Sequence, residues 1–82
     1  MSRVTVVAIH KGSLRYTPGE LVLQSPRSCA VRLGEPADTS WRQGMEISIV
    51  IHGDEPSAML GLLRSLPSND GIISVTPFEP LP

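Results

Sequence analysis

The clearest alternation of apolar and polar positions lies in the second half of the chain, between residues 45 and 78. Residues 45–52 read Met45, Glu46, Ile47, Ser48, Ile49, Val50, Ile51, His52. Because successive side chains of a strand point to opposite sides, this period of two predicts a strand with one apolar face. Residues 72–76 predict a second strand, with Ile73 and Val75 on one face.

Between these two strands the spacing changes and predicts a helix that ends near Leu66. Its apolar stripe has the spacing i, i+3, i+4, i+7 and consists of Met59, Leu62, Leu63 and Leu66. Asp54 can cap the first turn, Pro56 is tolerated there, and Pro67 stops the helix. We therefore predict a strand–helix–strand unit over residues 45–78, with two parallel strands and a right-handed crossover. The strands are neighbours or have one strand between them.

The first 44 residues predict shorter strands and one long loop. Residues 3–10 form a strand with apolar residues on both faces, and residues 29–33 form another. The sequence Thr17-Pro18-Gly19-Glu20 has the signature of a type II turn, which predicts a hairpin between residues 14–16 and 21–23. Residues 34–44 show no periodicity and form an irregular loop, and the proline-rich tail, residues 77–82, is extended.

Together these elements predict one α+β domain over residues 1–82, in the order β-β-β-β-α-β. A small mixed or antiparallel sheet of about five strands carries one amphipathic helix on one face. The strand–helix–strand half resembles half of a ferredoxin-like domain, such as the regulatory ACT domains. Gly71 to Pro77 resembles the last strand of subtilisin-type propeptides. Neither resemblance extends over the first 44 residues, so no family is assigned.

Composition narrows the class of protein. The 82 residues are 40% hydrophobic and 18% charged with a net charge of −1, which argues against disorder and against bulk attraction to nucleic acid or acidic membranes. A single cysteine excludes an internal disulfide framework. No run reaches the roughly 18 apolar residues of a membrane span, and the first residues lack a signal-peptide pattern. We therefore expect a cytoplasmic protein.

Few residues suggest chemistry. His10 and His52 each end a predicted strand, and with Asp54 or Cys29 they could form a metal cluster if the strands were parallel neighbours. No pair has the spacing of metal ligands, which favours histidines at the solvent boundary. Cys29 is more typical of a buried core cysteine than of a nucleophile. The sequence predicts no catalytic constellation, metal or cofactor.

The candidate partner-binding residues are Trp41, Arg42, Arg32 and Phe78. Trp41 and Arg42 are adjacent in the irregular loop, and tryptophan and arginine are enriched among the residues that dominate binding energy. The alternative is that Trp41 folds back as a lid over the core. Six of the seven cations are arginines, and their separation along the chain favours solvated positions over a nucleic-acid surface.

These features predict a non-catalytic protein-interaction module, which would be an adaptor, an assembly factor or a small inhibitor of a larger complex. The alternative is a dimeric regulatory domain that senses a small ligand. A homodimer is also expected, because one face of the predicted sheet lacks a helical cover. That face would carry Val7 and Ile9, or else Val4 and Val6.

Overall fold

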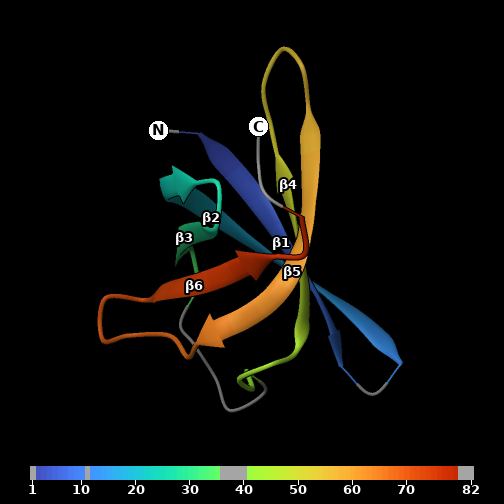
Figure 1. Cartoon of the computed structure of the whole chain (residues 1–82), viewed down its shortest axis with the longest axis vertical. Helices are drawn as coiled ribbons and strands as arrows, with labels where there is room; N and C mark the ends of the chain where they lie inside the picture. Colours follow the sequence, from blue (N-terminus) through green and yellow to red (C-terminus); the bar gives the residue numbers. More distant parts are fainter. Residues whose placement is uncertain (1, 11, 36–40, 80–82) are drawn as a thin grey trace.

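The computed structural model describes residues 2–10, 12–35 and 41–79, and this part of the chain is all-β. The strands are β1 (Arg3–His10), β2 (Ser13–Ser25), β3 (Ser28–Leu33), β4 (Glu46–Ile51), β5 (Ser57–Ser65) and β6 (Ile72–Pro77). Every pairing is antiparallel, and the strands close into a small barrel in the order β1-β2-β3-β6-β5-β4 (Figure 1).

The barrel consists of two three-stranded meanders. The strands β1, β2 and β3 pair consecutively, and so do β4, β5 and β6. Two seams join these halves: β1 pairs with β4, where Val6 lies opposite Ile49, and β3 pairs with β6, where Val31 lies opposite Ile73. Residues 34–45 connect the two meanders, so each seam joins strands that are distant in sequence.

The core is formed by the inward-facing half of each strand. Because side chains alternate across a strand, every second residue in the middle of β1, β3, β4, β5 and β6 is buried. The buried apolar residues are Val4, Val6, Ala8, Cys29, Val31, Leu33, Trp41, Ile47, Ile49, Met59, Leu63, Ile73 and Val75. Strands 3–10, 29–33, 45–52 and 72–76 are thus confirmed to within a residue or two at their ends.

The predicted helix is wrong, and with it the α+β fold class. Residues 57–65 form β5, which pairs with β4 on one side and β6 on the other. Met59, Gly61 and Leu63 face the core at a period of two, whereas Leu62 and Leu66 of the expected stripe are exposed. Gly61 allows β5 to pack closely against β6. A Cβ there would collide with the carbonyl oxygen of Thr76, so only glycine lets the β6 backbone approach this closely.

The crossover and the resemblance to a ferredoxin-like half are therefore corrected as well. The strands β4 and β6 do run in the same direction, because each pairs antiparallel with β5, but the element between them is a strand. The barrel has six strands where about five were expected. Nothing helical lies in the described residues, so they hold no helix that could cross a membrane.

The predicted hairpin around Pro18 and Gly19 is also wrong. The strand β2 runs without interruption from Ser13 to Ser25 and turns into β3 at residues 26–27. Pro18 fits in a strand because it lies where β3 ends, so its missing N–H interrupts no ladder. Gly19 faces inward, where a Cβ would lie 2.7 Å from the carbonyl oxygen of Arg32, so its role is close packing and not a turn.

Candidate functional site

The four residues predicted to bind a partner are not brought together by the fold. Arg32 lies opposite Ile72, on the outer face of β3, whereas the N–H of Phe78 donates to the carbonyl of Leu60 in β5. Arg32, Arg42 and Phe78 are exposed, and their role in binding a partner stays a prediction. Trp41 is only 6% exposed and belongs to the core, as the alternative interpretation of a lid expects.

The fold separates the two histidines along the β1–β4 pair. Because β1 and β4 are antiparallel, His10 and His52 lie toward opposite ends of the pair, and no group of potential metal ligands occurs among the described residues. The ring Nε2 of His52 is 2.7 Å from the hydroxyl of Thr5. Cys29 is fully buried, and desolvation by burial raises the pKa of its thiol, which disfavours the nucleophilic thiolate.

Two adjoining open cavities lie along the outside of β1, β2 and β3, and we call them together the β1–β3 groove. The first, of about 320 Å³, is lined by Arg3, Pro18, Gly19, Glu20, Arg32, Leu33 and Gly34. The second, of about 340 Å³, is lined by Arg3, Val4, Thr5, Pro18, Gly19 and His52. The shared residues are Arg3, Pro18 and Gly19, so β1 and β2 form the middle of the groove.

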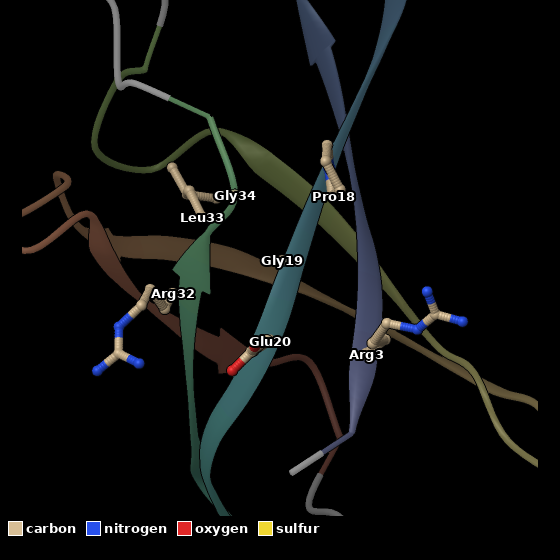
Figure 2. Close-up of a pocket in the computed structure, with 7 residues that line it drawn as sticks. All are labelled: Arg3, Pro18, Gly19, Glu20, Arg32, Leu33 and Gly34. Atoms are coloured by element: carbon tan, nitrogen blue, oxygen red, sulfur yellow. The ribbon is translucent and has the colours of Figure 1, made fainter.

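Strand register places the charges of the groove. Glu20 lies directly opposite Arg3 on one side and Arg32 on the other, so a carboxylate sits between two guanidinium groups. Figure 2 shows the two arginine side chains extending away from Glu20 in opposite directions. A guanidinium group is a fork of N–H donors that matches carboxylate and phosphate oxygens. Arg3 and Arg32 therefore offer such donors at opposite sides of the groove, with the Glu20 carboxylate between them.

A second surface feature is apolar, and we call it the hairpin patch: Ile9, Leu14 and Tyr16 on the outer face of β1 and β2. Ile9 and Leu14 are a cross-strand pair, and the three side chains are 50%, 55% and 62% exposed, respectively. Val4 and Val6, the other candidates for an uncovered face, are in the core. The homodimer was expected because one face of the sheet would lack a helical cover. That reason is wrong, since the closed barrel encloses its own core.

Sequence reasoning missed Arg3, Glu20 and Leu14 as site residues. Their signal is the alternation of outward positions, which continues through β2 as Leu14, Tyr16, Pro18 and Glu20. The Pro-Gly pair was interpreted as a turn, which broke that alternation in two. Without a continuous β2, the Arg3–Glu20–Arg32 row cannot be derived.

Comparison with known proteins adds no identification: no protein-family model, curated protein or solved structure matches this chain.

Proposed function

We propose that this chain is a non-catalytic protein-interaction module, an adaptor, assembly factor or small inhibitor, that binds its partner through the hairpin patch. The observation that supports it is the grouping of Ile9, Leu14 and Tyr16 on one face of the β1–β2 hairpin. Figure 1 shows this hairpin projecting from the barrel. Contiguous exposed apolar residues on a soluble domain typically mark an interaction site. A cytoplasmic location is part of this proposal.

The chemistry of the patch fits this role. Tyrosine buries a large ring while its hydroxyl keeps a hydrogen-bonding partner, and it is enriched among residues that dominate interface energy. Ile9 and Leu14 flank it with aliphatic surface that is held in place by the β1–β2 ladder. A partner with a complementary apolar surface would gain about 25 cal/mol for each Å² of apolar area removed from water.

The test is affinity capture from cell extract with three baits: the wild-type chain, Leu14→Ser and Leu23→Ser. Leu23 is a matched control because its exposure, 59%, is similar to that of Leu14, yet it lies beyond the shift in the β2–β3 register between Leu21 and Leu23, opposite Ala30 of β3. We expect a protein retained by the wild type and by Leu23→Ser to be lost from Leu14→Ser. Equal retention by all three baits would contradict the role of the patch.

A second function is favoured by the β1–β3 groove: sensing of a small anionic ligand. Two arginines flank the groove, and together with Glu20 they leave an excess of positive charge over it. The groove lies within one chain, so this function does not require the dimer that the sequence suggested. Phosphate-bearing or carboxylate-bearing metabolites are the matching class of ligand.

Thermal unfolding in the presence of pyrophosphate, citrate or nucleotides tests this second function. A ligand present at about 100 times its Kd stabilises the folded state by about 2.7 kcal/mol. Arg3→Gln and Arg32→Gln should each abolish that stabilisation, whereas Arg64→Gln, an exposed arginine on β5, should retain it. A stabilisation that survives in all three variants would place the ligand elsewhere.

A further inference from the structure

The end of the β1–β3 groove nearest β4 is lined by polar side chains of one kind. The second cavity has three of them, those of Arg3, Thr5 and His52. Each can donate a hydrogen bond through a guanidinium, a hydroxyl or an imidazole group. Among the described residues no acidic side chain lines this cavity, whereas Glu20 lines the first one. The carboxylate of the groove thus belongs to its other end.

Strand register brings the three donors to one face of the barrel. Arg3 and Thr5 are two residues apart on β1, so both side chains point outward on either side of the buried Val4. The backbone N–H of His52 donates to the carbonyl of Arg3 at 3.0 Å, which continues the β1–β4 ladder. In Figure 2 the Arg3 side chain extends away from Glu20 on β2, and therefore toward the β4 side of β1. Two paired strands thus hold all three donors.

The hydrogen bond between Thr5 and His52 leaves a donor for a ligand. The hydroxyl oxygen of Thr5 is 2.7 Å from Nε2 of His52. If the hydroxyl donates to Nε2, the ring carries its N–H at Nδ1, and that N–H is left over. If Nε2–H donates instead, the hydroxyl hydrogen is left over. Either tautomer of the neutral ring therefore keeps one donor beside the guanidinium fork of Arg3, and a protonated ring keeps two.

We propose that this cavity binds the phosphoryl group of a small metabolite through Arg3, Thr5 and His52. The inference rests on the second proposed function, sensing of an anionic ligand, and it specifies which group is recognised and at which end of the groove. A phosphoryl group has three strong acceptor oxygens and a charge of about −1.5 to −2 at neutral pH, so it can accept from all three side chains. A carboxylate has only two oxygens. Asp54 and Glu55, the acidic residues nearest to His52 in the sequence, do not line the cavity.

Titration of the whole chain with inorganic phosphate, followed by NMR, tests the site. The pH is kept constant, and sodium chloride keeps the ionic strength constant. The ring signals of His52 and the amide signal of Arg3 should shift and saturate, whereas the ring signals of His10, the other histidine, should not. Acetate should bind about tenfold more weakly than phosphate. The absence of a saturable shift at His52, or acetate binding as tight as that of phosphate, would overturn the proposal.

Three variants test the contacts. Arg3→Gln and Thr5→Val each remove one donor, and Arg32→Gln is the matched control, because this exposed arginine lines only the first cavity. We expect Arg3→Gln to weaken phosphate binding about tenfold and Thr5→Val about threefold or more, while Arg32→Gln stays within about twofold of the wild type. Equal weakening by Arg3→Gln and Arg32→Gln would mean that phosphate responds to overall charge, and it would reject the site.

Failure of this inference and failure of the second proposed function give different results. If citrate or a nucleotide stabilises the chain in a way that depends on Arg32, while phosphate leaves the His52 signals unchanged, ligand sensing stands and the phosphoryl site is rejected. If none of these anions binds, both are rejected.

Discussion

At the scale of single residues, Thr17 is the exception in the core. Its side chain is 3% exposed and faces the interior from β2, opposite Val6 of β1. The hydroxyl oxygen has no hydrogen-bond partner in the described part of the chain. A buried polar group without a partner costs about 1–3 kcal/mol, because it has given up its bonds to water. The Thr17 hydroxyl therefore lowers the free energy of unfolding, and its removal should raise it.

Thr17→Val should stabilise the fold by about 1 kcal/mol or more, because valine has the same shape and no hydroxyl to desolvate. Urea unfolding of the variant and the wild type measures the change in the free energy of unfolding. Thr76→Val, at an exposed position on β6, serves as the control and should change it little. A loss of stability in Thr17→Val would mean that the hydroxyl is bonded in solution.

At the scale of elements, β5 shows why a strand can be taken for a helix. Leucines and methionine at positions 59, 62, 63 and 66 match helical spacing. The true inward set is Met59, Gly61 and Leu63, and its middle member is a glycine, which carries no apolar signal. Strands without such a gap, such as β4 with Ile47, Ile49 and Ile51, were predictable from alternation alone.

Gly61→Ala tests this account of β5. Its new Cβ would meet the Thr76 carbonyl and lie 2.9 Å from a methyl group of Val75, and overpacking of this kind costs about 1–3 kcal/mol. A helix would instead gain stability from the same change. Gly53→Ala, where a Cβ would meet nothing within 4 Å, is the control for chemical denaturation. Stabilisation by Gly61→Ala would contradict a strand here.

At the scale of the whole molecule, closure of the barrel decides what the sequence could and could not predict. Alternation identifies single strands, but the β1–β3 groove needs the register of three strands, with Glu20 set between Arg3 and Arg32. Register depends on which residues of two separate strands lie opposite each other. Alternation with a period of two does not determine this, because any pair of strands shows the same period. The groove therefore became visible only when the order β1-β2-β3-β6-β5-β4 was known.

Trp41 lies on the segment between the two meanders, and its side chain packs into the core that they share. Trp41→Ala should lower the free energy of unfolding by about 3–5 kcal/mol, the usual loss for a buried large aromatic residue. Arg42→Ala, at the exposed neighbouring position, should leave it within about 0.5 kcal/mol. If the Trp41→Ala variant keeps its stability but binds the partner more weakly, Trp41 contributes to the interface and not to the core.

The two seams have a consequence for how the chain is made. When β1, β2 and β3 have left the ribosome, the β1 edge that β4 will cover and the β3 edge that β6 will cover are both unpaired. A nascent half-barrel thus carries two adhesive edges and an apolar face, which are the features that promote aggregation. Neither edge is paired until the second meander has formed, so a fragment that ends near residue 45 would expose both edges and tend to aggregate.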